Sequence, residues 1–191
     1  MAQVIANGAV AVFLAALYHA FPHPAVFVSF VAVVAVSNAD TFATELGILS
    51  KSKPFLITTF KRVENGASGA ISVLGTAAEA AGAFLIAVAA LALLYASGET
   101  QSLAVNPLLF LAIVTFSGLL GAMADSFFGA TTQAMYYCKA CGKQTEKTPL
   151  HSCGQKTEFK RGIRWVDNDV VNLFSTIVGG LAAAGLWLFL T

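Results

Sequence analysis

The feature that most constrains this chain is a series of five long apolar segments separated by short polar ones. They cover about Val4–Phe21, Ala25–Leu49, Ser68–Ala96, Asn106–Asp125 and Asn168–Leu190. A helix needs about 20 apolar residues to cross a bilayer. Only 11% of the residues are charged, whereas soluble domains carry about 25%. The sequence therefore predicts an all-α integral membrane protein with about five transmembrane helices, in a single transmembrane domain over residues 1–191.

The placement of the cations predicts how these helices are oriented. All eleven Lys and Arg residues lie in two windows, Lys51–Arg62 and Lys139–Arg164. Basic residues that flank membrane spans are enriched in cytoplasmic loops. We therefore expect both windows on the cytoplasmic side, with the N-terminus inside and the C-terminus outside. The net charge of +1 gives no reason to expect nucleic acid as a partner.

A short motif occurs twice, each time near the cytoplasmic end of an apolar segment. The copies are Ala39-Asp40-Thr41-Phe42 and Ala124-Asp125-Ser126-Phe127, and each is followed downstream by a second matched pair, Val63-Glu64-Asn65 and Val166-Asp167-Asn168. This order predicts two helical hairpins that repeat in parallel about an axis along the membrane normal, with the first helix as an extra element. Asp40 and Asp125 would then lie at equivalent depths, and so would Asn65 and Asn168.

The three cysteines of the chain lie close together in the second basic window. They form the pattern C-x2-C-x9-H-x-C through Cys138, Cys141, His151 and Cys153. Four nitrogen and sulfur ligands at such spacing suit a tetrahedral Zn²⁺ ion. A disulfide is disfavoured because the loop is expected to face a reducing compartment. The pattern predicts a structural zinc site that folds a cytoplasmic insert, residues 138–167, within the transmembrane domain.

The polar residues around the repeated motif predict a site for metal ions and phosphate. On a helix Asp40 and Thr44 share one face, and Glu45 lies on the neighbouring face. Carboxylate and amide oxygens bind Mg²⁺ readily together with substrate phosphates. Backbone N–H groups at a helix start, which we expect at Ser68, hold phosphate oxygens. With an apolar wall for a lipid tail, the chain looks suited to place a phosphorylated lipid against a water-soluble phosphate donor.

These motifs resemble the DUF92 family of integral membrane proteins, also called the TMEM19 family, whose plant members include phytyl-phosphate kinase of the tocopherol pathway. The resemblance covers about Asn38–Gly180. It is carried by Ala39-Asp40-Thr41, Thr44-Glu45-Leu46-Gly47, Asn65-Gly66, Ser68-Gly69, Gly75-Thr76, Asp125-Ser126, Gly129-Ala130, Gln133, the Cys and His ligands with Gly154, and Asn168-Asp169-Val170-Val171-Asn172.

The resemblance implies Mg²⁺-dependent phosphoryl transfer from a nucleoside triphosphate to phytyl or another prenyl monophosphate, which gives the diphosphate. CTP is implied as the donor by analogy with polyprenol kinases, and the prenyl chain is not fixed. We assign Asp40, Asp125 and Asp169 as catalytic residues, with Asp40 and Asp125 as ligands of Mg²⁺. The residues assigned to bind substrate and phosphate are Thr44, Glu45, Lys61, Arg62, Asn65, Ser68, Asn168 and Asn172.

Two other classes of function are left open by the sequence. A small membrane transporter would use the carboxylates of Asp40, Glu79 and Asp125 to bind ions or protons. A structural or assembly protein would use the zinc loop for contacts, and a homo-oligomer is compatible with any of these. Glu79 lies in a patch of small residues in the third segment, where it either faces the polar pocket or is a neutral packing residue. The clustering of the other polar groups at one membrane face favours the enzyme.

Overall fold

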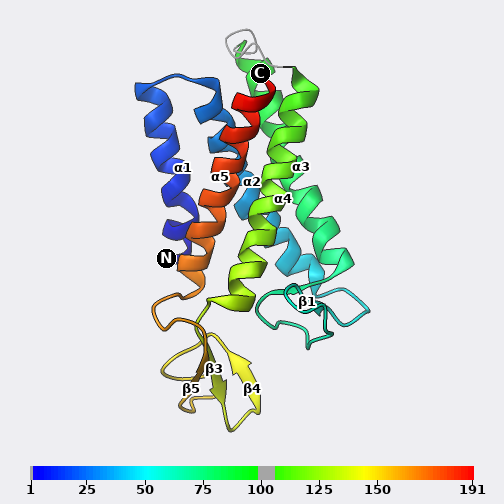
Figure 1. The fold of residues 1–191 in the computed structure, drawn as a ribbon, viewed down its shortest axis with the longest axis vertical. Helices are drawn as coiled ribbons and strands as arrows, with labels where there is room; N and C mark the ends of the chain where they lie inside the picture. The colour runs from blue at the N-terminus through cyan, green and yellow to red at the C-terminus, as the bar shows by residue number, and fades with distance from the viewer. Residues whose placement is uncertain (1, 99–105) are drawn as a thin grey trace.

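Five helices form the body of the molecule in a computed structural model that describes residues 2–98 and 106–191. They are α1 (Ala2–Ala20), α2 (Pro24–Gly47), α3 (Val73–Ser97), α4 (Pro107–Thr131) and α5 (Asn168–Leu190). Successive helices run in opposite directions (Figure 1). In the described residues, α2, α3, α4 and α5 are long and apolar enough to span a membrane, and α1 supplies a shorter apolar stretch. The predicted all-α membrane architecture is confirmed, with four helices of spanning length and α1 as a shorter apolar helix among the described residues.

Side chains before the first turn set where several helices begin. Asn106 Oδ1 accepts a hydrogen bond from the N–H of Leu108 at 2.9 Å, and Asp167 Oδ1 accepts one from Val170 at 3.0 Å. Such caps satisfy N–H groups that have no partner inside a helix. In α3 the cap is Ser72, whose hydroxyl accepts from the N–H of Gly75 at 3.0 Å.

The start of α3 corrects the sequence analysis, which placed the third segment from Ser68 onward. Gly66 and Gly69 have φ angles of 82° and 78°, a left-handed conformation that interrupts a helix and that glycine adopts at little cost. Between them and the helix, β2 (Ala70–Ile71) pairs with β1 (Phe55–Leu56) in an antiparallel ladder. Ser68 therefore lies in a glycine-containing loop, and the helix begins five residues later at Val73.

The core of the bundle depends on small residues that let helix backbones approach one another. Glycine and alanine are enriched at such contacts in membranes because close packing is a main source of helix association there. Gly118 of α4 lies against Ala35 and Ala83. Gly121 and Gly179, from α4 and α5, both face Val36 of α2, and neither position leaves room for a methyl group. Helix α2 thus lies at the centre of the bundle, in contact with the other four.

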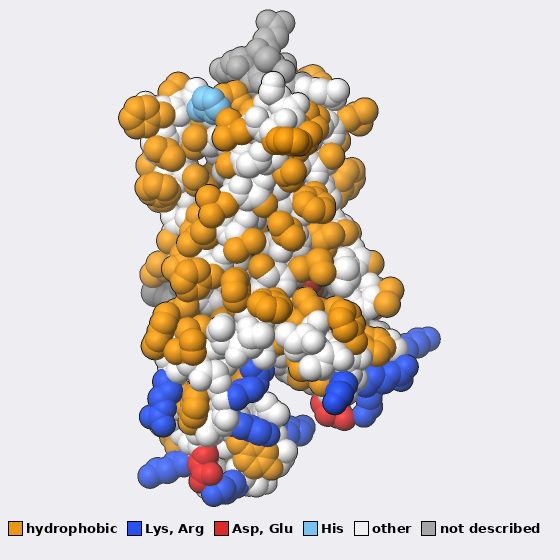
Figure 2. Space-filling model, in the orientation of Figure 1, with side chains coloured by type: hydrophobic (Ala, Val, Ile, Leu, Met, Phe, Trp, Pro, Cys, Tyr) orange, Lys and Arg blue, Asp and Glu red, His pale blue; other side chains and the backbone are white. Residues whose placement is uncertain are grey.

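The outer surface of the bundle is apolar, whereas the cations gather at one end (Figure 2). Large side chains such as Leu108 and Phe189 are 75% and 85% exposed, as expected for positions that face lipid. Both basic windows, which connect α2 to α3 and α4 to α5, emerge at the same end (Figure 1). We call this the basic end; the C-terminus lies at the opposite end. The shared end of the two basic windows agrees with the predicted pair of parallel hairpins.

A small sheet at the basic end was not predicted from the sequence. Strands β3 (Met135–Cys138), β4 (Lys143–Thr145) and β5 (Glu158–Arg161) pair antiparallel in the order β4-β3-β5. The guanidinium group of Arg161 donates hydrogen bonds to the carbonyl oxygens of Ala130 at 2.7 Å and Gly129 at 3.2 Å. The insert is thereby attached to the last turn of α4.

The close approach of α5 to α2 predicts a position-specific effect of adding one methyl group. Gly179→Ala should destabilise the protein relative to Gly185→Ala by about 1–3 kcal/mol, the usual cost of overpacking. Both changes gain the same helix propensity, but a Cβ at Gly179 meets Val36, whereas one at Gly185 meets nothing within 4 Å. Thermal unfolding in detergent measures the difference, and equal stabilities of the two variants would contradict this packing.

Candidate functional site

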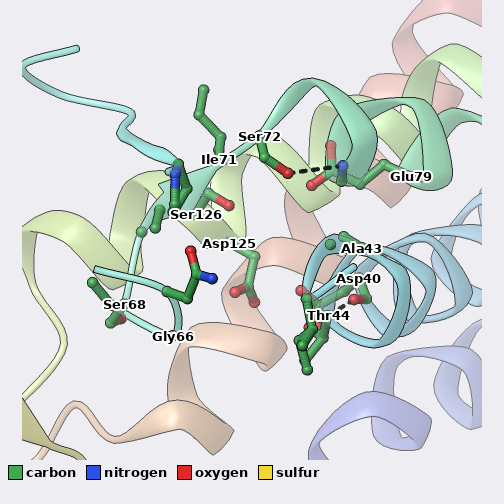
Figure 3. A pocket seen from close by; sticks show the side chains of 18 of the residues that line it. Asp40, Ala43, Thr44, Gly66, Ser68, Ile71, Ser72, Glu79, Asp125 and Ser126 are labelled. Carbon is green, nitrogen blue, oxygen red and sulfur yellow. Dashed lines mark hydrogen bonds between the residues drawn. The ribbon is translucent and has the colours of Figure 1, made fainter. Parts of the chain in front are cut away.

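A polar cavity of about 510 Å³ lies at the basic end of the bundle. Its wall is built from α2, α3 and α4, the loop before α3, and single residues of the insert and α5 (Figure 3). The residues that line it are Asp40, Ala43, Thr44, Gly47, Ile48, Pro54, Asn65, Gly66, Ala67, Ser68, Gly69, Ala70, Ile71, Ser72, Gly75, Thr76, Glu79, Asp125, Ser126, Gln133, Glu146 and Asn168. Both Asp residues of the repeated motif and both matched Asn residues are among them.

Three membrane helices each contribute one carboxylate to this cavity: Asp40 from α2, Glu79 from α3 and Asp125 from α4 (Figure 3). Each lies six or seven residues from the end of its helix at the basic end, which is about 10 Å at 1.5 Å per residue. The three groups therefore lie at similar depth, near enough for their charges to interact. This arrangement matches the equivalent depths predicted for the repeated motif.

The carboxylates have few partners within the protein. Glu79 is only 4% exposed, and its Oε2 atom, like Oδ2 of Asp125, is buried without a hydrogen-bond partner among the described residues. In the described part of the chain no Lys or Arg lines the cavity. An unpaired buried carboxylate is costly, and such groups within membrane spans mark functional sites. The cavity therefore favours a ligand that brings positive charge.

A fourth acidic group comes from the insert. Glu146 follows β4 and reaches the cavity at the basic end. Partial removal from water raises the pKa of its carboxyl group. No sequence signal connected Glu146 with the site, because it lies within the Cys- and His-containing loop, far along the chain from the first copy of the repeated motif.

The wall opposite the carboxylates is a glycine-containing loop packed tightly on α4. Gly69 lies against Ala130 so closely that a Cβ there would overlap it. The Ser68 hydroxyl donates a hydrogen bond to Gln133 Oε1 at 2.6 Å. Gln133 is 2% exposed, and its Nε2 atom has no partner among the described residues. Gly66, Ser68 and Gln133 all line the cavity, and each has an N–H group without a hydrogen-bond partner among the described residues.

The structure brings together some, but not all, of the residues that the sequence assigned to the site. Asp40, Thr44, Asn65, Ser68, Asp125 and Asn168 line the cavity, whereas Glu45, Lys61, Arg62, Asp169 and Asn172 do not. The guanidinium carbon of Arg62 lies 5.6 Å from the centre of the Phe55 ring, and Lys61 is exposed. Asp169 lies in the first turn of α5, and Asn172 is buried one turn further along.

Apart from Glu79, whose role was left open, five polar lining residues were not assigned to the site from the sequence: Ser72, Thr76, Ser126, Gln133 and Glu146. Ser72 and Thr76 were placed inside a helix expected to begin at Ser68. Gln133 follows the second Asp motif by eight residues and is one of the motif residues that carry the family resemblance, but neither signal indicated its contacts. Its position in the cavity depends on the hydrogen bond to Ser68, which is 65 residues away in the chain.

The insert contains a compact group of four potential metal ligands. One ligand atom each from Cys138, Cys141, His151 and Cys153 lies within 4.8 Å of the others. Individual separations are 3.6 Å from Cys138 to Cys153, 3.4 Å from Cys141 Sγ to His151 Nδ1, and 3.2 Å from His151 Nδ1 to Cys153 Sγ. Ligands about 2.3 Å from a tetrahedral ion lie about 3.8 Å apart. The group can therefore hold one metal ion such as Zn²⁺ after shifts of a few tenths of an ångström in the ligand atoms.

The protonation of the thiols also suits a metal. A hydrogen bond with His151 is the main cause that lowers the pKa of Cys153 to about 6. A hydrogen bond with Cys153 is the main cause that raises the pKa of Cys141 to about 11. At neutral pH the group thus already holds one thiolate, the form that binds metal ions. The three cysteines are free of disulfides.

We predict that protein purified without chelators contains one zinc ion per chain. Cys141→Ser should lower the zinc content well below one ion per chain and loosen the insert, because metal binding stabilises small domains that lack an apolar core. His151→Ala should have the same effect as Cys141→Ser. Its control is His19→Ala, a histidine change outside the insert. Elemental analysis gives the metal content, and unchanged zinc in both Cys141→Ser and His151→Ala would contradict the assignment.

Comparisons with known proteins agree with the resemblance seen in the motifs. The family model for the integral membrane protein DUF92 matches residues 1–180. An uncharacterized membrane protein of Methanocaldococcus jannaschii is 33% identical over 94% of this chain and 58% of its own length. Protein PGR of Arabidopsis thaliana is 32% identical over 75% of this chain and 49% of its own length.

This chain spans about half the length of these curated relatives. No solved structure matches it. The family model covers nearly the whole chain, and the four apolar helices of the described residues agree with a family of integral membrane proteins. The chain belongs to the DUF92 family of integral membrane proteins.

Proposed function

We propose that the protein transfers the terminal phosphoryl group of a nucleoside triphosphate, CTP in the first instance, to a prenyl monophosphate in the membrane. In this reaction an oxygen of the acceptor phosphate forms a bond to the terminal phosphorus of the donor, and the bond from that phosphorus to the bridging oxygen breaks. The products are a prenyl diphosphate and a nucleoside diphosphate. One observation carries this proposal: within the cavity, carboxylates from three helices lie opposite a loop that has N–H donors.

The lining of the cavity fits Mg²⁺. The side-chain atoms that could bind the ion are oxygens. One of them, the buried Oδ2 atom of Asp125, has no hydrogen-bond partner among the described residues. The described lining has no basic side chain that would take the place of the ion. Mg²⁺ keeps several water molecules and usually binds one or two carboxylates together with substrate phosphates. Asp40 and Asp125 would hold the ion, which when bound offsets the charge of the phosphate groups.

The chain's own residues would position the two phosphates. The backbone N–H groups of Gly66 and Ser68 donate no hydrogen bond within the described part of the protein, and both residues line the cavity. These N–H groups and the side-chain amides of Asn65 and Asn168 would donate hydrogen bonds to phosphate oxygens. Such bonds would orient the nucleotide and the prenyl phosphate for in-line attack. The second pKa of a phosphate monoester is about 6, so the attacking oxygen is ionised at neutral pH and needs no strong base.

The remaining assigned residues would act around this centre. The hydroxyl group of Thr44 donates a hydrogen bond to the backbone oxygen of Asp40 at 2.9 Å. This hydrogen bond orders the helical turn that carries the Asp40 carboxylate. Lys61 and Arg62 would attract anionic substrates from a distance rather than bind them. Glu45, Asp169 and Asn172 would support the cavity wall from the ends of α2 and α5. The prenyl chain would lie along the apolar surface of the helices.

A cation or proton transporter is the second candidate, and a specific observation favours it. Glu79 places an almost fully buried carboxylate in α3 with no basic partner in the described lining. Transport sites of this kind lie between helices that expose ionisable groups. Such a protein would bind cations without Mg²⁺-dependent turnover of a nucleotide, so measurement of turnover separates the two functions.

Asp125→Asn tests the proposed reaction directly. The change keeps the side-chain shape and removes one charge, so prenyl diphosphate formation should fall by two or more orders of magnitude at limiting Mg²⁺, because a catalytic metal supplies several kcal/mol of charge stabilisation. Asp40→Asn should behave similarly. The assay uses purified protein in lipid, labelled CTP or ATP, and prenyl monophosphates of several chain lengths.

Asp167→Asn is the matched control. Asp167 caps α5 and does not line the cavity, and Asn caps helices as well as Asp, so its activity should remain near that of the wild type. If Asp40→Asn and Asp125→Asn both retain near-wild-type rates at limiting Mg²⁺, the reaction takes place elsewhere or does not take place.

We also propose that the basic end, with the cavity and the insert of residues 138–167, faces the cytoplasm. All eight Lys residues lie in the two basic windows, so an amine reagent that cannot cross membranes should modify lysines in inverted vesicles but not in right-side-out vesicles. Ser97→Lys adds an amine at the opposite end and should be modified in right-side-out vesicles. Modification of the native lysines from the outside would reverse the orientation.

A further inference from the structure

Glu79 is the one acidic residue of the cavity whose role the sequence left open. It lines the cavity, is 4% exposed, and its Oε2 atom has no hydrogen-bond partner in the part of the chain that the structure describes. A protonated glutamate that merely packs in a membrane helix normally donates its proton to a nearby acceptor. Glu79 instead has an oxygen without such a partner among the described residues, and its side chain is part of the polar lining of the cavity (Figure 3).

Close helix contacts on both sides of Glu79 fix its position against α2. One turn before it, Gly75 packs against Gly47. One turn after it, Gly82 packs against Phe42, and its carbonyl oxygen accepts a hydrogen bond from the amide of Asn38 at 2.9 Å. These contacts bring the backbones of α2 and α3 together around one level of the bundle, the level of Asp40.

The charge balance at this level requires a cation or protons. Asp40, Glu79 and Asp125 line one cavity at similar depth, and the described lining contains no Lys or Arg. Like charges held close together in a medium of low dielectric constant repel strongly. One divalent cation placed among the three groups relieves all three repulsions at once, whereas a proton on Glu79 relieves only those that involve Glu79.

We propose that Glu79 is a ligand of a divalent cation at the buried side of the cavity, bound jointly with Asp40. The identity of the ion as Mg²⁺ rests on the proposed function; the cation site itself rests on the geometry. In the described residues only the Cys and His group of the insert is compact enough for three or more ligands to share one ion directly. The cation among the more widely spaced carboxylates therefore keeps part of its water shell, as Mg²⁺ and Mn²⁺ do.

The test uses Mn²⁺ as a paramagnetic probe of the zinc-loaded protein, without nucleotide or lipid substrate. Titration followed by electron paramagnetic resonance gives the affinity for Mn²⁺. Glu79→Gln, which keeps the size of the side chain, should weaken binding about tenfold or more, in line with the loss of a group that supports a metal site. Glu158→Gln is the matched control, because Glu158 pairs with Lys139 on the insert surface and should leave the affinity unchanged.

Equal Mn²⁺ affinity of Glu79→Gln and wild type would overturn the proposal and make Glu79 a protonated packing residue. If Glu79→Gln does not fold, Glu79→Asp replaces it: this variant keeps the charge but shortens the reach, so weaker binding at unchanged thermal stability supports the proposal and unchanged binding refutes it. Binding is measured without turnover. Wild-type protein that binds Mn²⁺ but transfers no phosphate would therefore refute the proposed function and leave the cation site in place.

Discussion

The constraint on which the rest of the structure depends is a group of three carboxylates that line one cavity between membrane helices, with no basic residue in its described lining. A charge in a bilayer is costly unless it faces a cavity, a partner or a bound ion. The helices meet this constraint by placing Asp40, Glu79 and Asp125 within two turns of the basic end, where one cavity serves all three. Small residues are needed for this arrangement, because Gly75 and Gly82 let α3 approach α2 on both sides of Glu79.

The polar structure at the basic end completes the cavity without filling it. The loop before α3 is held in place by the contact of Gly69 with Ala130 and by the hydrogen bond from Ser68 to Gln133. The insert is attached to the same turn of α4 through Arg161, and it places Glu146 in the cavity. An insert with few buried apolar residues needs another source of rigidity, and four metal ligands provide one. Folding of the insert and the shape of the cavity are therefore linked through the last turn of α4.

Much of this arrangement follows from the sequence because the signals are local. Apolar length predicts the helices, the spacing of Cys138, Cys141, His151 and Cys153 predicts the metal ligands, and the repeated Ala-Asp motif predicts that Asp40 and Asp125 share one site. Contacts between distant segments were not predictable in the same way. The hydrogen bond from Ser68 to Gln133 and the position of Glu146 in the cavity depend on how two loops fold back on the helices, which neither composition nor periodicity encodes.

The positive and negative side chains at the basic end lie in different places. The cations outside the cavity would attract anionic substrates, whereas the carboxylates lie inside the cavity, where these substrates would bind. Lys and Arg side chains surround the basic end but are absent from the described lining of the cavity, which is acidic. Such a surface raises the local concentration of anions, yet a phosphate entering the cavity alone would meet four carboxylates. Under the proposed function a phosphate would therefore enter only together with cations that match its charge, and each carboxylate would then gain a favourable neighbour. The same acidic lining that makes the empty cavity costly would thus make binding of a phosphate dependent on the metal ion that the proposed reaction requires.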